Sequence, residues 1–242
     1  MQTQAPAFSA WLDDFFAAYY RRRPVNATFI GLHQYDDQLP DFSREGAEDT
    51  SSEMEALLAQ LRALPPERLD QAEALDRTLA EGFLQIQLWE YASQHFHRGN
   101  PSLYTGEAIF GILSLFLTDF APFADRVESA IARMEAIPRL LSQGKNNVRQ
   151  APLAWTERAI RECTGALAFF QGGAEELIQD GGIDGGRFLA AAANAATAVG
   201  GFQQYLETEL RTRVTDDCAC GEEAFDLMMR QGFQEEGEAE GK

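Results

Sequence analysis

Basic side chains are scarce in this chain of 242 residues. It has 20 lysines and arginines against 38 aspartates and glutamates, so its formal net charge is −18 at pH 7. Proteins that bind nucleic acid or an anionic membrane surface carry basic patches, and the longest basic run here is Arg21–Arg23. We therefore expect no nucleic acid and no membrane among its partners.

Long apolar runs and cysteines are also few. The most apolar run, Ala108–Leu117, is well short of the roughly 20 residues that cross a bilayer. Three cysteines are an odd number and form no disulfide framework. The first residues lack the basic and then apolar segments of a secretory signal. Together these features predict a cytoplasmic location.

Sequence motifs of the common catalytic sites are missing as well. The chain contains no Gly-x-Ser-x-Gly elbow, no phosphate-binding glycine loop and no dinucleotide fingerprint. No histidine is followed by glutamate, so the His-Glu-x-x-His motif of zinc peptidases is absent. The residues themselves therefore predict no catalytic site.

The sequence is rich in helical patterns. Hydrophobic residues make up 45% of it, which is typical of a protein with a core. Apolar residues recur at steps of three or four, as at Leu75, Leu79 and Phe83, and this spacing indicates amphipathic helices. We see no strand pattern. We predict an all-α fold, a single multi-helix domain of about eight to ten helices over residues 1–233, followed by an acidic, disordered tail at 234–242.

The ends of the expected helices are set by proline, glycine and turn residues. We expect helices over residues 8–23, 24–31, 45–64, 69–97, 102–117, 127–141, 152–179, 184–214 and 221–233. Pro138 should kink one of them or end its first half. Residues 33–42 should form an ordered loop with two turns.

Two short pairs of residues could in principle hold a metal ion. His95 and His97 are two positions apart, so on a helix they would point to different faces. Cys218 and Cys220 are separated by one residue, whereas a structural zinc site wants four ligands at wider spacing. We expect a structural role for the histidines and free thiols in a loop for the cysteines.

Three aspartates, Asp36, Asp37 and Asp41, could bind calcium. The EF-hand loop places ligands at alternate positions and a glycine at the sixth, but the sixth position counted from Asp36 is Asp41. We expect these side chains to cap turns and helix N-termini instead. Otherwise they would form a polar contact surface, with Arg21–Arg23 as counter-charges.

The same stretch offers candidate binding residues: His33, Tyr35, Asp36 and Asp41. A groove beside them could bind a small molecule or a peptide, because aromatic residues make up 11% of the chain and could line a pocket. A less favoured hypothesis uses His33 with Asp36 or Asp41 as an acid/base pair. Histidines near carboxylates are common in plain turns.

Several segments carry a family resemblance. They are PVNAT at 24–28, GLHQYD at 31–36, LPDFS at 39–43, ARMEAIP at 132–138 and GEEAF at 221–225. Together, in this order, they resemble the bacterial family called domain of unknown function 885. The resemblance implies a fold like the N-terminal half of helical carboxypeptidase- and oligopeptidase-like proteins.

Full-length members of that family are longer and resemble zinc metallopeptidases. Their His-Glu-x-x-His motif, in which two histidines hold zinc and the glutamate acts as general base, lies in the C-terminal half. By resemblance this chain covers the N-terminal region, one wall of the cleft. No zinc ligand has a matching position here, so we assign no catalytic residue and no cofactor. Zinc would come only with a partner chain or a further C-terminal half.

Two functions therefore remain open. We expect a non-catalytic helical domain that acts through protein interaction, as a homo-oligomer or with a zinc-bearing partner chain, or as the cleft wall of a longer peptidase. The alternative is a small-molecule or peptide-binding protein with a groove near His33, Tyr35 and Asp36. We do not expect the chain to be an enzyme on its own.

Overall fold

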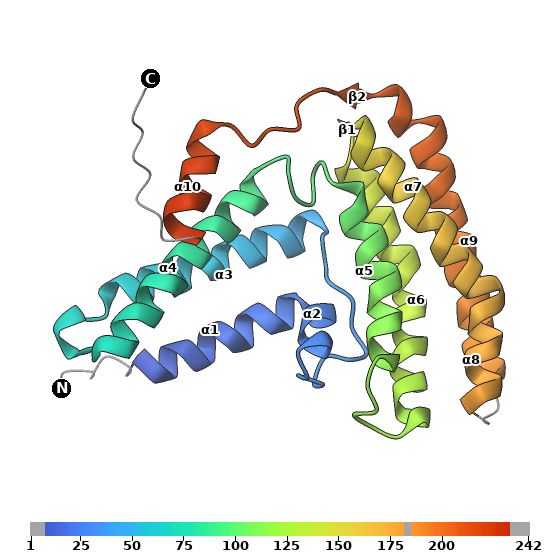
Figure 1. Cartoon of the computed structure of the whole chain (residues 1–242), viewed down its shortest axis with the longest axis horizontal. Coiled ribbons are helices and arrows are strands. Elements are labelled where there is room, and N and C mark those ends of the chain that lie inside the picture. Colours follow the sequence, from blue (N-terminus) through green and yellow to red (C-terminus); the bar gives the residue numbers. More distant parts are fainter. Residues whose placement is uncertain (1–7, 182–184, 233–242) are drawn as a thin grey trace. The chain divides into compact units, whose positions relative to one another are not determined.

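The regular structure of the chain is almost wholly helical. The computed structural model describes residues 8–181 and 185–232. Its helices are α1 (Phe8–Arg22), α2 (Pro24–Phe29), α3 (Arg44–Ala63), α4 (Gln71–Ala92), α5 (Pro101–Leu113), α6 (Phe123–Asn147), α7 (Leu153–Ala168), α8 (Ala174–Gly181), α9 (Gly186–Thr208) and α10 (Glu222–Gly232) (Figure 1). Short 3-10 turns are η1 (Pro66–Arg68), η2 (Ser114–Phe116) and η4 (Leu210–Thr212).

A π-helical turn, η3 (Phe169–Gly173), joins α7 to α8 without a break. If this continuous stretch is counted once, the described residues form nine helices. The expectation of an all-α fold with eight to ten helices is therefore confirmed. The tail predicted at 234–242 lies outside the described residues.

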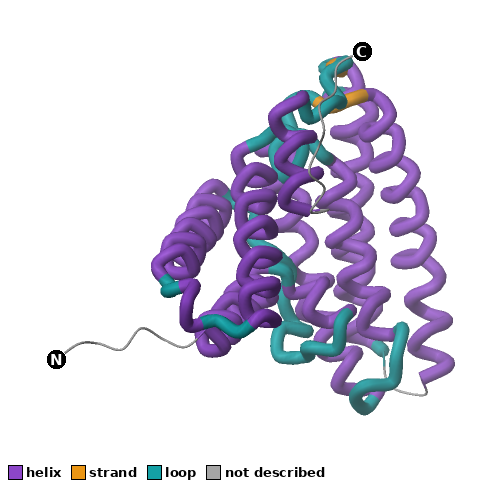
Figure 2. The backbone as a smooth tube through the Cα atoms, turned by 60° about the vertical axis from the view of Figure 1, so that its left-hand side comes forward, coloured by secondary structure: helices purple, strands orange, loops and turns teal. Residues whose placement is uncertain are grey.

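One small strand pair was not expected from the sequence. Strands β1 (Ala151–Pro152) and β2 (Val214–Thr215) pair in parallel, with Ala151 opposite Val214 (Figure 2). Two residues are too few to show the alternation that identifies a strand, so only the folded chain reveals this pair.

Some helix ends also differ from the expectation. The helix expected to reach His97 ends at Ala92, because Ser93 is extended (φ −84°, ψ 174°) and its hydroxyl donates to the carbonyl of Glu90. The helix around Pro138 is not ended there, and α6 runs on to Asn147. Gly31 stops the short second helix as expected, at a φ of +92° that favours glycine.

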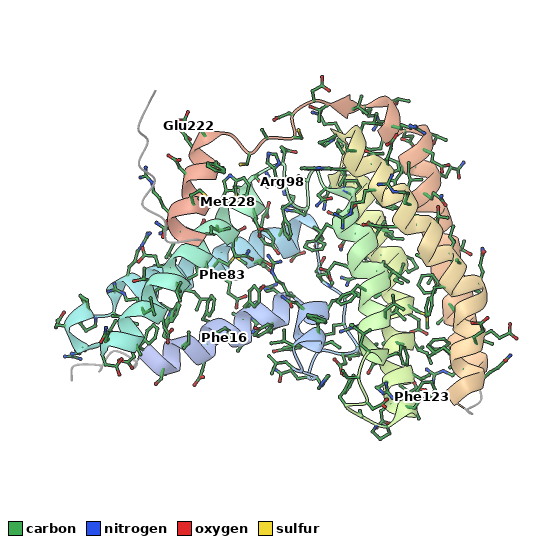
Figure 3. All side chains as sticks on the ribbon, viewed as in Figure 1. Phe16, Phe83, Arg98, Phe123, Glu222 and Met228 are labelled. Atoms are coloured by element: carbon green, nitrogen blue, oxygen red, sulfur yellow. The ribbon has the colours of Figure 1, made fainter. Side chains whose placement is uncertain are left out.

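The first of two compact units contains residues 8–19, 44–95 and 219–232, and therefore most of α1 with α3, α4 and α10. Its core includes Trp11, whose indole nitrogen donates to the carbonyl of Leu57 at 3.1 Å. Helix α10 packs against α4 (Figure 3 labels Phe83 on α4 and Met228 on α10). Gly82 makes this close packing possible, because a Cβ there would lie 2.5 Å from the carbonyl oxygen of Gln231.

The second unit contains residues 20–43 and 96–218. Helix α6 packs against α5 and α9, and α7 packs against the same two helices (Figure 1). The side chains of Tyr104, Ile112, Met134, Ile137 and Phe202 are fully buried in this bundle. The bundle supports α2 and the loop that follows it, which carry the candidate binding residues.

No helix among the described residues combines the length and the apolar character that crossing a bilayer requires.

Candidate functional site

The loop after α2 is built around the carboxylate of Asp36. This side chain is buried. Its Oδ1 accepts a hydrogen bond from the Thr28 hydroxyl at 2.5 Å, and its Oδ2 lies 3.0 Å from Nδ1 of His33. The structure therefore brings together His33 and Asp36, two of the four residues predicted from the sequence.

A buried arginine from α6 connects this loop to the bundle. The guanidinium of Arg133 donates five hydrogen bonds, to Gly111 O (2.6 Å), Ser114 Oγ (3.4 Å), Pro24 O (3.3 Å), Thr28 Oγ1 (2.6 Å) and Tyr35 O (3.3 Å). Burial lowers the pKa of Arg133 to about 10, against the opposing effect of Asp36. The group still carries its charge at neutral pH, so it acts as a buried cation facing the carboxylate of Asp36.

Sequence reasoning missed the role of Arg133. A signal was present, because Arg133 lies three residues after Ala130 and four before Ile137, on a face of α6 whose buried residues are apolar apart from Arg126 and Arg133. A charge on such a face is rarely buried without partners. Tyr35, which was predicted, contributes its backbone carbonyl to this network.

The imidazole of His33 is held on a second side by an aromatic ring. It stacks on Phe120, with ring centroids 3.6 Å apart and an interplanar angle of 9°. The guanidinium of Arg126 lies 5.9 Å from the centroid of Phe120 and is paired with Asp119 at 2.7 Å. The His33 side chain is 32% exposed. With Nδ1 directed to Asp36, its Nε2 is the ring nitrogen that a ligand could use.

Asp41 belongs to a different set of contacts. Its Oδ1 accepts hydrogen bonds from the amide of Ser43 (2.9 Å) and from Nε2 of Gln143 (2.7 Å), and Arg139 lies 3.6 Å from Oδ2. Burial alone would raise the pKa of Asp41, but these contacts outweigh it and lower the pKa. Asp41 thus caps the turn before α3 as expected for the aspartates. Of the two acid/base pairs considered, the hydrogen bonds support only His33 with Asp36.

A second buried carboxyl, Glu107 on α5, was not identified from the sequence. Its Oε2 is buried and accepts no hydrogen bond from the residues that the structure describes. Burial raises the pKa of Glu107 to about 7, although the positive charges of Arg23 and Arg133 lower it. Glu107 therefore titrates near neutral pH.

Replacing Glu107 with glutamine should change how stability depends on pH. A carboxyl whose pKa rises on folding binds its proton more tightly in the folded state, so folding weakens as the pH rises from about 4.5 to about 7. We expect Glu107→Gln to remove on the order of 2 kcal/mol of this loss. Urea unfolding at pH 5 and pH 8 measures it, with the exposed Glu135→Gln as control. An unchanged pH dependence in Glu107→Gln would contradict the prediction.

The two histidines at 95 and 97 lie beyond the end of α4. His95 stacks on Trp89 at 5.9 Å, and His97 is buried beside the ring of Phe42. Burial, aided by Arg98, lowers the pKa of His97 to about 4. His97 is therefore neutral at physiological pH, which suits a core position.

Cys218 and Cys220 are free thiols in a segment without helix or strand. Within residues 8–181 and 185–232, no three histidine, cysteine, aspartate or glutamate side chains gather as a metal site requires.

Comparison with known proteins places the chain in a family. The model of a family described as bacterial proteins of unknown function (DUF885) matches residues 24–240. No curated protein matches the sequence. A solved structure of a candidate lipoprotein of unknown function from Shewanella oneidensis matches with a TM-score of 0.81 and 24% identity.

That structural match covers 94% of this chain but 42% of the longer one. This chain thus spans less than half the length of the solved protein, and at this identity the likeness shows a shared fold alone. The family match extends over most of the sequence and confirms the resemblance read from the five segments between residues 24 and 225. The chain belongs to the DUF885 family of bacterial proteins of unknown function.

Proposed function

We propose that this chain is a non-catalytic helical domain that acts through protein interaction. It would form one wall of a cleft whose metal-bearing half lies on a second chain or in a longer polypeptide. The observation that carries the proposal is the partial match, because the fold that makes up 94% of this chain makes up 42% of a longer solved chain. Where a fold recurs inside a larger chain, part of its surface is available for the remainder to cover.

An exposed apolar face supports this proposal. Five large hydrophobic side chains of α2, α5 and the residues just after them remain exposed, namely Phe29, Ile30, Phe110, Leu113 and Leu117. The rings of Phe29 and Phe110 lie 5.5 Å apart, and α2 contacts both α5 and η2. We call this set the α2/α5 face. Clustered exposed apolar side chains with aromatic members are typical of protein interfaces.

The chemistry is expected on the partner. The family resemblance implies a zinc peptidase whose His-Glu-x-x-His motif holds the metal and supplies the general base. That motif is absent from this sequence. The proposed occupant of the α2/α5 face is therefore a helical chain that carries this motif.

Native mass spectrometry of the protein from its own host, with metal analysis, tests the proposal. We expect a complex with a second chain that contains His-Glu-x-x-His and zinc. We expect the double variant Phe29→Ser/Leu117→Ser to lose this partner, and the control Leu189→Ser, which changes an exposed leucine of α9, to keep it. A lone, metal-free chain, or metal-dependent peptide cleavage by the purified chain alone, would refute the proposal.

A second candidate function is the binding of a small molecule or peptide beside His33. The specific observation in its favour is the partly exposed imidazole, held in place by Asp36 and Phe120. A chain recovered alone from its host would favour this function over the first. The cytoplasmic location stays a prediction from the sequence.

A further inference from the structure

A cavity of about 390 Å³ lies in the first unit, whereas the loop that carries His33 belongs to the second. Its walls come from η1 and the residue after it, from α4 between Ala74 and Gln85, and from the end of α10. The lining residues are Pro66, Leu69, Ala74, Arg77, Thr78, Glu81, Gln85 and Gln231. This size is at the lower end of the range that small-molecule sites occupy.

The cavity contains a cation without a counter-ion. Nε of Arg77 is buried and has no hydrogen-bond partner, and no ion pair joins Arg77 to a carboxylate among the described residues. A buried donor left unsatisfied is costly, so such groups normally have a partner. Nε itself is shielded from anything in the cavity, but Arg77 lines the cavity and its terminal NH2 groups make no hydrogen bond among the described residues, so these groups are left to bind an acceptor that enters it.

The carboxylates four positions before and after Arg77 on α4, Glu73 and Glu81, are already engaged. Glu81 pairs with Arg62 at 2.7 Å and accepts a hydrogen bond from Gln85 at 3.3 Å. Asp70 and Glu73 form the capping box that starts α4, with their side chains on backbone amides. These contacts leave the charge of Arg77 to a ligand.

The remaining walls indicate the rest of the ligand. Pro66, Leu69 and Ala74 are aliphatic residues of the cavity wall, and Gln231 of α10 also lines it. Arginine is the side chain best suited to two parallel hydrogen bonds with a carboxylate. We propose that this cavity binds a carboxylate attached to a short aliphatic body, either a free organic acid or the C-terminal end of a peptide.

The test uses N-acetyl-leucine as the acid and N-acetyl-leucine amide as its uncharged match. Isothermal titration calorimetry measures affinity, and the ¹⁵N-detected Nε–H signal of Arg77 reports a change at its guanidinium when the terminal NH2 groups bind. We expect the amide to bind at least about tenfold more weakly than the acid, because it loses the charge-assisted hydrogen bonds. We expect the Nε–H signal to shift with the acid only.

Arg77→Met keeps most of the aliphatic stem and should weaken binding of the acid by about tenfold or more. Arg77→Lys keeps the charge but not the planar guanidinium, so its affinity for the acid should lie between those of the unchanged chain and Arg77→Met. The control is Arg68→Gln, an exposed arginine of η1 that does not line the cavity, and it should bind like the unchanged chain. Circular dichroism checks that each variant is folded.

If Ala-Ala-Leu binds more tightly than N-acetyl-leucine, the ligand is the C-terminal end of a peptide. If Ala-Ala-Leu binds more weakly, the ligand is a free organic acid. Equal affinity for acid and amide, no binding at millimolar concentration, or unchanged affinity in a folded Arg77→Met would each overturn the proposal. None of these outcomes depends on the partner chain proposed above, so the two proposals fail separately.

Discussion

Replacing Arg133 with methionine should lower the free energy of unfolding by about 3 to 5 kcal/mol, the usual cost of removing one member of a buried, charged network. The guanidinium is fully buried and joins three parts of the second unit: the first turn of α2 with the loop after it, the end of α5, and α6 itself. Without it, Asp36 keeps its buried negative charge but loses the cation that faces it.

Urea unfolding measures this effect, and Arg139→Met is the matched control on the same helix. The side chain of Arg139 is about half exposed, and its ion pair with Asp41 is long, at 3.6 Å. Its loss should therefore cost no more than about 1 kcal/mol. The signals of His33 should also move in Arg133→Met, since Thr28 then loses its donor and its contact with Asp36 is free to change. Equal unfolding midpoints for the two variants would show that the buried network contributes little.

Replacing Gly82 with alanine should displace α10 from α4. The new Cβ would lie 2.5 Å from the backbone oxygen of Gln231 and 3.0 Å from its Cβ. A backbone group cannot rotate away as a flexible side chain can, so one helix must shift. We expect a loss of about 1 to 3 kcal/mol, typical of overpacking, together with weaker binding in the Arg77 cavity, which Gln231 helps to line.

Hydrogen exchange measures the displacement directly, because the amides of residues 222–232 should exchange faster in Gly82→Ala. The control is Gly106→Ala in α5, where a Cβ meets nothing within 4 Å. There the better helix propensity of alanine should stabilise the protein by about 0.5 to 1 kcal/mol. Slow exchange across α10 in Gly82→Ala would mean that the two helices accommodate the methyl group.

The fold class was readable from the sequence because its signals are local. The spacing of apolar residues predicts each helix, and Pro24, Gly31 and the Gly99-Asn100-Pro101 break end helices through their own backbone preferences. Contacts between remote segments could not be read in this way. The strand pair between residues 151–152 and 214–215 is one case, since hydrogen bonding between remote segments leaves no local pattern.

The candidate sites also contain a part that follows from local sequence and a part that depends on contacts between remote residues. The sequence by itself determined that His33 and Asp36 are close, because they are three residues apart in a turn. It also determined that this chain lacks the zinc motif. Only the tertiary structure placed Arg133, about 100 residues further on, against Thr28 and Tyr35, and left Arg77 without a counter-ion among the residues that the structure describes. Whether a charge is buried, and which groups face it, depends on how helices pack, and packing joins residues that the chain keeps far apart.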